Sequence, residues 1–141
     1  MSRVFWDAML FIYLLENNPK FAPAVVAALA HSRRRNDLLL TSHLSIAEAL
    51  VGMQSGGPVE LALRKALQEM GVMLVAFDDA AVEPFRRLRR DFGLAAADSM
   101  HLACAAAAKT DLFLTGDKQL LKKRLHVPGI QFIADFMNPP F

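Results

Sequence analysis

The sequence predicts an α/β fold in which a parallel sheet of four or five short strands is covered by helices on both faces. Short apolar segments alternate along the chain with longer segments of helical spacing, a pattern typical of parallel sheets. The chain has 141 residues, of which 54% are hydrophobic, enough for one substantial core. Because the sequence has no internal repeat, we expect a single domain over residues 1–141.

Two strands and four helices are expected in the first half of the chain. Arg3–Trp6 is apolar and aromatic, which favours extended geometry and predicts the first strand. Ala8–Glu16 has helical apolar spacing and ends at an Asn-Asn-Pro sequence. The elements that follow are a helix over Pro23–His31, a strand over Leu38–Thr41, a helix over Ser42–Met53 capped by Ser42 or Ser45, a loop at Gln54–Pro58 and an amphipathic helix over Val59–Met70.

Three strands and three helices are expected in the second half. Asp78 and Asp79 are suited to cap a helix, in which Pro84 requires either a late start or a kink. The other elements are strands over Val72–Phe77 and Leu112–Thr115, an Ala-rich helix over Leu94–Lys109, a turn at Gly116-Asp117, a short basic helix over Lys118–Leu125 and an edge strand over Gly129–Ile133.

The composition indicates a globular cytoplasmic protein. Charged residues make up 21% of the chain, and no segment has the roughly 18 uncharged residues that a membrane span requires. The N-terminal segment resembles a signal peptide, but Asp7 interrupts its apolar part and no small-residue cleavage site follows, so we expect it in the mature structure. Cys104 is the single cysteine, which excludes a disulfide framework and fits a reducing cytoplasm.

The basic residues are unevenly distributed. The net charge is only +2, yet three clusters hold most of the sixteen basic residues. These clusters are Arg33–Arg35, Arg86–Arg90 and Lys122–Arg124. A single cluster is usually a solvated face, but three of them in a small domain permit a polyanionic partner.

Asp98 is the only formal charge between Leu94 and Ala108. A helix that is apolar on nearly all sides is buried, and an isolated buried carboxylate costs several kcal/mol or protonates. Asp98 therefore requires a cation, a shifted pKa or a capping position at the start of its helix. His101, three residues later, shares its helix face.

Three further carboxylates are placed unusually. Asp7 and Asp117 follow directly after predicted strands, where function gathers in parallel sheets, and Glu48 lies on an apolar side of its helix. None of these acids has a Lys or Arg three or four residues away except Asp7, and its neighbour Arg3 lies in a predicted strand, where that spacing does not bring side chains together. Two interpretations remain open: the aspartates cap the helices that follow them and Glu48 is a surface residue, or the four acids meet in one pocket.

Carboxylates that meet in one pocket repel one another unless a divalent cation lies among them. A set of oxygen ligands selects a hard ion, Mg²⁺ or Mn²⁺. The chemistry that suits such a cluster is phosphodiester hydrolysis, in which the ion activates water and neutralises the leaving oxygen. The basic clusters would then hold the substrate backbone.

Four segments in this order carry a family resemblance: VFWD, IAEAL, GLAAADSMHLACA and LFLTGDKQLL. Together they resemble the PIN-domain ribonucleases, and within that group the toxins of VapBC toxin–antitoxin pairs. The resemblance spans nearly the whole chain, and ADSMHLA and LTGD are its most specific parts. It implies an α/β/α fold, Mg²⁺- or Mn²⁺-dependent endonucleolytic cleavage of RNA, a homodimer, and inhibition by an antitoxin whose C-terminal segment occupies the active-site groove.

The resemblance also assigns roles to particular residues. It implies that Asp7 and Asp98 are direct metal ligands, and that Glu48 and Asp117 complete the catalytic site directly or through water. Thr115 matches the hydroxyl position ahead of the last aspartate, and we interpret His101 as a group packed beside the ligands rather than a catalytic base. One departure is Ala8, which stands where many members have Ser, Thr or Asn.

Three other functions compete with this interpretation. A haloacid dehalogenase-type phosphatase requires a second aspartate two residues after the first, where this chain has Met9. A phosphoacceptor receiver domain requires an acidic pair at the end of the first strand, and Asp7 has no acidic neighbour. A catalytically silent PIN-like scaffold that binds RNA or a protein is the non-enzymatic alternative.

Overall fold

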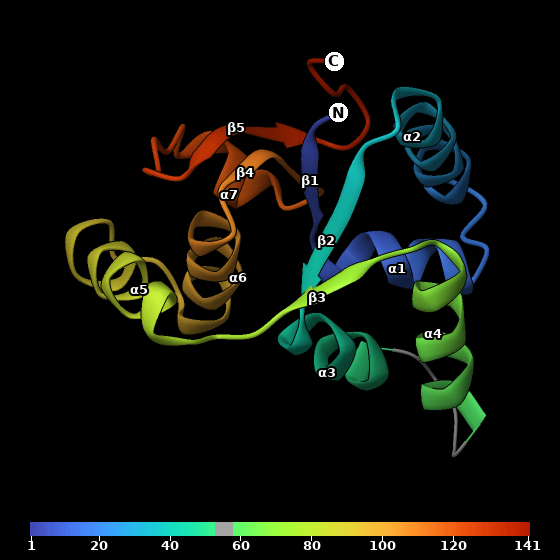
Figure 1. Cartoon of the computed structure of the whole chain (residues 1–141), viewed down its shortest axis with the longest axis horizontal. Helices are drawn as coiled ribbons and strands as arrows, with labels where there is room; N and C mark the ends of the chain where they lie inside the picture. Colours follow the sequence, from blue (N-terminus) through green and yellow to red (C-terminus); the bar gives the residue numbers. More distant parts are fainter. Residues whose placement is uncertain (53–57) are drawn as a thin grey trace.

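A computed structural model describes residues 1–52 and 58–141, and within these ranges five parallel strands form one sheet. The strands are β1 (Arg3–Trp6), β2 (Leu38–Ser42), β3 (Met73–Val75), β4 (Thr110–Thr115) and β5 (Ile130–Asp135). They lie in the order β3-β2-β1-β4-β5, and every neighbouring pair is parallel. The predicted parallel sheet is therefore confirmed (Figure 1).

Helices cover both faces of this sheet. In the described ranges they are α1 (Ala8–Leu15), α2 (Ala22–Arg35), α3 (His43–Gly52), α4 (Pro58–Glu69), α5 (Asp79–Asp91), α6 (Ala96–Ala107) and α7 (Lys118–Lys122). Figure 1 shows α5, α6 and α7 on one side of the sheet and α1, α2 and α4 on the other. The layered arrangement that the alternating pattern predicted is the one observed.

The central strand β1 supplies side chains to a separate core on each face. Val4 and Trp6 pack with the apolar residues of α1, α2, α3 and α4, whereas Phe5 packs with those of α5, α6 and α7. Successive side chains of a strand point to opposite faces, which explains this division. Phe5 also stacks on Phe113 of β4 at a ring distance of 5.1 Å. Full burial of side chains of this size contributes about 1.5–3 kcal/mol each, so β1 is anchored from both faces.

Several element boundaries differ from the predictions. Helix α2 continues past His31 to Arg35, because nothing before Asn36, which adopts a left-handed conformation at φ 58°, interrupts it. Strand β3 has three residues rather than six, and α7 ends at Lys122 rather than Leu125. Of the predicted loop Gln54–Pro58, residues 54–57 lie outside the described residues, as does Met53, and Pro58 begins α4.

Helix α5 resolves the prediction about Pro84. Asp78 caps the helix through a carboxylate oxygen that accepts a hydrogen bond from the backbone N–H of Ala80 at 3.1 Å. The helix therefore begins at Asp79, which excludes the late start of the two predicted alternatives, and the kink stays a prediction. Pro84 lies inside the helix, after its first turn.

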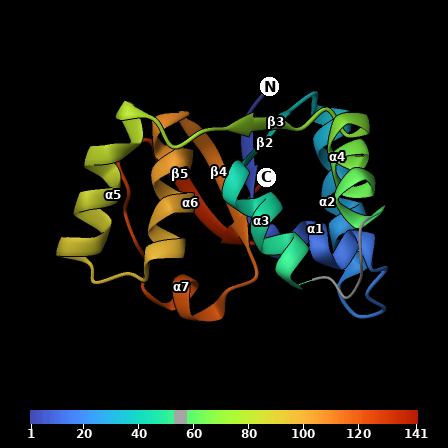
Figure 2. The same cartoon turned by 90° about the horizontal axis from the view of Figure 1, so that it is seen from below.

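The order in which the chain adds strands to the sheet reverses at the pair β1 and β4. From β1 the chain proceeds to β2 and β3 on one side, then crosses to β4 and β5 on the other. In open parallel sheets the carboxyl ends of the two strands beside such a switch form a crevice. Figure 2 views the molecule from the end at which β2 leads into α3, and α1, α3, α6 and α7 surround this end of the sheet.

No helix of the described ranges combines the length and the apolar character that crossing a bilayer requires.

Candidate metal centre

Asp7 follows β1 and continues its pairing with β4, since its backbone N–H donates to the carbonyl of Leu114 at 3.0 Å. Its side chain does two things. One oxygen, Oδ1, accepts a hydrogen bond from the backbone N–H of Ala8 at 2.8 Å, at the start of α1. The other, Oδ2, accepts from the hydroxyl of Thr115 at 2.8 Å. Asp7 is thus both a helix cap and a neighbour of β4.

Thr115, the last residue of β4, joins Asp7 to Asp117. Its fully buried hydroxyl donates to Asp7 and accepts from the backbone N–H of Asp117 at 3.1 Å. The Asp117 carboxylate caps α7 by accepting from the backbone N–H groups of Gln119 at 2.9 Å and Leu120 at 3.2 Å. One side-chain hydroxyl therefore fixes the ends of two neighbouring strands relative to each other.

Asp98 lies in the first turn of α6 but does not cap it. The helix begins at Ala96 rather than Leu94, and its cap, Ala95, makes no side-chain hydrogen bond. Burial raises the pKa of the Asp98 carboxyl, and the charges of Asp117, Asp7 and Glu48 raise it further, while His101 lowers it. The capping interpretation is wrong for Asp98, and the three other carboxylates are close enough to repel its charge.

Glu48 reaches the same place from α3. One of its carboxylate oxygens, Oε1, is hydrogen-bonded to Nε2 of His101, and this nitrogen lies 4.0 Å from Oδ1 of Asp7. Ligand atoms of Asp7, Glu48 and His101 all lie within 4.8 Å of one another. The four acids named from the sequence are therefore brought together, with His101 among them.

The sequence suggested Ser42 only as a cap, and the structure gives it a second contact. Its hydroxyl accepts from the backbone N–H of Ser45 at 3.3 Å, which confirms the capping role, and it also lies 3.0 Å from Nδ1 of His101. The position of Ser42 at the end of a strand, at the same edge of the sheet as Asp7 and Asp117, places it near the site, but its contact with His101 depends on how α6 packs.

The four acids and His101 line a cleft of about 700 Å³. Asp7, Glu48, Asp98 and Asp117 lie along one part of it, and no Lys or Arg is among its described lining residues. The remaining lining is largely apolar and comes from α1 and α3, as Met9, Ile12, Tyr13, Leu44, Ala47 and Val51. Three helices begin here, since Asp7 and Asp117 cap α1 and α7 and Asp98 is in the first turn of α6.

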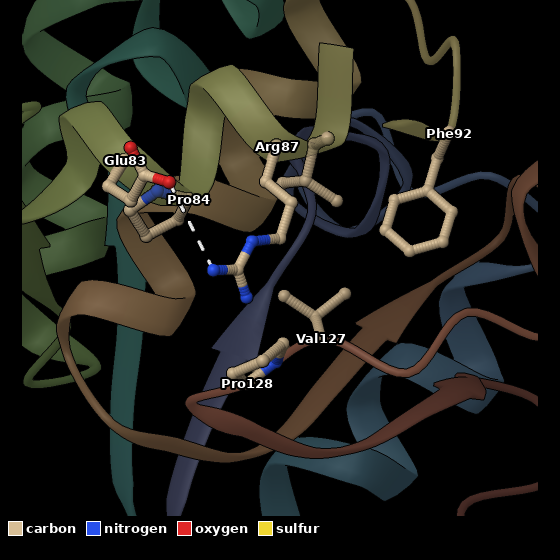
Figure 3. Close-up of a pocket in the computed structure, with 7 residues that line it drawn as sticks. Glu83, Pro84, Arg87, Phe92, Val127 and Pro128 are labelled. Atoms are coloured by element: carbon tan, nitrogen blue, oxygen red, sulfur yellow. Dashed lines mark ion pairs between the residues drawn. The ribbon is translucent and has the colours of Figure 1, made fainter. Parts of the chain in front are cut away.

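A second, smaller hollow of about 210 Å³ lies against α5 and is built differently (Figure 3). Pro84, Leu88, Phe92, Val127 and Pro128 give it an apolar wall. Its one acid, Glu83, is paired with Arg87 at 4.0 Å and with Arg86 at 2.7 Å. The charge of Glu83 in this hollow is therefore balanced by two arginines. Among the described ion pairs, none joins a Lys or Arg to the four acids of the cleft.

The donor set of the cleft fits a hard divalent cation. Four carboxylates supply oxygen ligands, which suit Mg²⁺ and Mn²⁺. Burial first, and then repulsion by the three other acids, raises the pKa of Asp98, and a cation would favour its charged form.

Solved structures of similar fold were found. VapBC2 from Rickettsia felis, bound to a DNA fragment from its promoter, matches with a TM-score of 0.72 at 13% identity, covering 94% of this chain and 98% of that chain. VapBC-1 from nontypeable Haemophilus influenzae matches with a TM-score of 0.66 at 16% identity, covering 96% and 99%. VapBC-5 from Mycobacterium tuberculosis matches with a TM-score of 0.62 at 18% identity, again covering 96% and 99%.

At these identities the likeness concerns the fold alone. No curated protein matches the chain. The family model described as the PIN domain matches residues 4–124, which include all four clustered acids. The resemblance expected from the sequence is confirmed: this chain belongs to the PIN-domain family.

Proposed function

We propose that this protein is a metal-dependent endoribonuclease that hydrolyses RNA phosphodiester bonds. The observation that carries the proposal is the convergence of Asp7, Glu48, Asp98 and Asp117 in one cleft that has no Lys or Arg among its described lining residues. Isolated acids on a protein surface do not require a partner. In this cleft, burial and the charges of Asp117, Asp7 and Glu48 together raise the pKa of Asp98, so a cation among these acids would stabilise the charged carboxylate.

The four acids would hold the ion in two ways. Asp7 and Asp98 would be direct ligands, with Glu48 and Asp117 completing the site directly or through water. Thr115 holds Asp7 by a hydrogen bond of 2.8 Å, so that its carboxylate keeps one orientation. Placement of ligands by such neighbouring groups is what gives a site its affinity and geometry. The chemistry supplied with a bound Mg²⁺ or Mn²⁺ is activation of water and neutralisation of the leaving oxygen.

The chain itself must bind and orient the RNA. Of the three basic clusters, Lys122–Arg124 lies at the end of α7, which begins at the cleft, and offers positive charge with which to hold a phosphate backbone. Arg33–Arg35 ends α2 at the opposite, amino end of the sheet, where Arg35 pairs with Asp37. The apolar part of the cleft, from α1 and α3, offers surface for unpaired bases, since base edges and faces of single strands are accessible for stacking. An acidic cleft by itself repels RNA, so substrate binding depends on the ion and on these surrounding groups.

We further propose that the protein acts in the cytoplasm as the toxin of a toxin–antitoxin pair, as a homodimer inhibited by a cognate antitoxin. Three of the structural neighbours carry the name VapBC, and another is a toxin–antitoxin complex from Klebsiella pneumoniae. The apolar lining of the cleft suits an antitoxin segment with apolar side chains.

Purified protein incubated with cellular RNA and Mn²⁺ tests the proposal. We expect cleavage by the wild type, loss of cleavage with EDTA, and loss of cleavage by Asp7→Asn, which keeps the shape of the side chain and removes its charge. Asp91→Asn, at an exposed position near the end of α5, is the matched control and should cleave normally. Sequencing of the cut ends would then identify the target.

Intact RNA in the presence of Mn²⁺, with a protein that still binds RNA, would overturn the nuclease and favour the silent scaffold. Cleavage that survives both EDTA and Asp7→Asn would point to a contaminating enzyme.

A further inference from the structure

Three side chains from different elements form a hydrogen-bonded row beside the candidate metal centre. Ser42 at the end of β2 contacts Nδ1 of His101 on α6, and Nε2 of His101 contacts Glu48 on α3. His101 is 3% exposed and Ser42 is 2% exposed, so both are shielded from solvent. Phe5 covers the ring of His101 in an edge arrangement with the ring centres 6.3 Å apart. The imidazole therefore has little freedom to turn.

The hydrogen-bond partners of the two His101 ring nitrogens determine which nitrogen carries the proton. The Ser42 hydroxyl already accepts from the backbone N–H of Ser45, and among the described residues its hydrogen has no acceptor other than Nδ1 of His101. A hydroxyl that donates to Nδ1 requires that nitrogen to be bare, which leaves the ring proton on Nε2. That proton then faces the Glu48 carboxylate, which only accepts.

We propose that Ser42 fixes His101 as a hydrogen-bond donor to Glu48, so that His101 positions this carboxylate and is withheld from the metal ion. This inference rests on the proposed metal-dependent function. It makes Ser42 and His101 positioning residues, and it assigns them a further consequence, which is the choice of metal. An Nε2 that carries a proton cannot be a ligand, although it lies within reach of the same point as Asp7 and Glu48.

Keeping Nε2 of His101 away from the metal ion affects which metal the site binds, because divalent metals differ in their affinity for nitrogen ligands. Sites with nitrogen ligands favour Ni²⁺ and Zn²⁺ strongly over Mn²⁺, whereas carboxylate oxygens suit Mg²⁺ and Mn²⁺. Without the Ser42 hydroxyl, Nδ1 is free to carry the proton, and Nε2 becomes available to a metal ion beside Asp7 and Glu48. The Ser42 hydroxyl thus keeps the centre an oxygen site.

Calorimetric titration of the full chain with Mn²⁺ and with Ni²⁺ tests this inference. For Ser42→Ala we expect Mn²⁺ affinity to fall about tenfold, as is usual when a group behind a ligand is lost. Ni²⁺ affinity should hold or rise, so the ratio of Ni²⁺ to Mn²⁺ affinity increases at least about tenfold. Ser45→Ala is the matched control, because Ser45 in the first turn of α3 is as buried as Ser42 at the end of β2, and its hydroxyl contacts Thr41 instead of His101.

The outcomes separate this inference from the proposed function. If the wild type binds Mn²⁺ and the affinity ratio is the same in Ser42→Ala, the role of Ser42 is overturned and the metal centre stands. If the wild type binds no Mn²⁺, the metal centre itself is overturned, and the role of Ser42 with it.

Two further measurements do not depend on Ser42→Ala, which also removes the cap of α3. His101→Gln retains an N–H group to donate to Glu48 and should bind Mn²⁺ nearly as well as the wild type, whereas His101→Ala should bind it about 10- to 100-fold more weakly. Equal losses in both variants would contradict positioning through a hydrogen bond. Long-range ¹H–¹⁵N spectra of the metal-free wild type should show His101 protonated at Nε2, and protonation at Nδ1 alone would overturn the inference.

Discussion

The two ends of the parallel sheet use the same kinds of residue in opposite ways. At the amino end, Asp37 accepts hydrogen bonds from the backbone N–H of Ser2 at 2.8 Å and from Arg35 at 3.2 Å. Asp111 there accepts from the backbone N–H of Arg3 at 2.7 Å. At the carboxyl end, the charges of Asp117 and Asp7 add to burial in raising the pKa of Asp98, and no Lys or Arg forms an ion pair with these three acids in the described part of the chain.

This difference separates acids that are paired within the fold from acids that are left for another partner, which under the proposed function is the metal ion. Charge-assisted hydrogen bonds at the amino end tie the start of the chain to the sheet and stabilise the folded state. Repulsion at the carboxyl end lowers stability in the absence of an ion, a cost typical of functional sites. Substituting one acid at the amino end and one at the carboxyl end of the sheet tests the two roles separately.

The largest effect is expected from isosteric changes at the two ends. Asp117→Asn should lower RNA cleavage more than about 100-fold, because a carboxylate of the centre is lost, which exceeds the usual loss for groups behind the ligands. Asp111→Asn keeps an oxygen that accepts from Arg3 and should cleave normally. Initial cleavage rates at saturating Mn²⁺ check both, and similar rates for the two variants would contradict the division.

A large loss of stability is expected at the amino end. Asp37→Ala leaves the backbone N–H of Ser2 and the guanidinium of Arg35 without their acceptor, and the Asp37 side chain is only 2% exposed. The free energy of unfolding should fall by about 1.5–3 kcal/mol. Urea denaturation measures this, and the cleavage rate per folded molecule should be unchanged. A lowered rate without lowered stability would place Asp37 in the function instead.

Thr115→Val tests whether the acids at the carboxyl end need a neighbouring hydroxyl to hold them in position. The valine is similar in shape but loses the hydrogen bonds to Asp7 and to the backbone N–H of Asp117. We expect Mn²⁺ affinity to fall about tenfold, at the lower end of the range for groups that orient ligands. Titration with Mn²⁺ measures it, and an unchanged affinity would show that Asp7 needs no such support.

The smallest effect concerns pH. The pKa of Asp98 is raised from the ordinary 3.8, so the folded state binds this proton more tightly than the unfolded state does. In EDTA, stability is therefore lost as pH rises from 3.8 through the raised value, and the wild type should become less stable relative to Asp98→Asn over that range. Urea denaturation at a series of pH values checks the sign. A difference that is constant with pH, or that grows in favour of the wild type, would contradict the repulsion.

Much of the fold could be predicted because local patterns agree with tertiary packing. The run Val4–Trp6 is apolar throughout, and it forms a strand buried on both faces. Boundaries were less predictable where packing decides them. Met73–Val75 pairs with β2 along only three residues, and nothing in the sequence of residues 72–77 marks where this pairing stops.

The candidate site was predictable to the extent that position along a strand indicates position in space. Asp7 and Asp117 directly follow strands that prove to be neighbours, so their proximity follows from the sheet order. Capping and clustering were treated as alternatives, but Asp7 and Asp117 do both, since one carboxylate has enough acceptor sites for each task. The contact of Ser42 with His101 depends on the packing of α6 against β2, which no local spacing reports.

The start of α1 and of α6 at the cleft has a consequence for folding without metal. The first turn of a helix carries exposed N–H groups equivalent to about half a positive charge. Asp7 and Asp98, which lie at these two helix ends, therefore receive part of their counter-charge from the backbone itself. We therefore expect the first turns of α1 and α6 to offset part of the repulsion in the metal-free protein, so that it folds before an ion is bound.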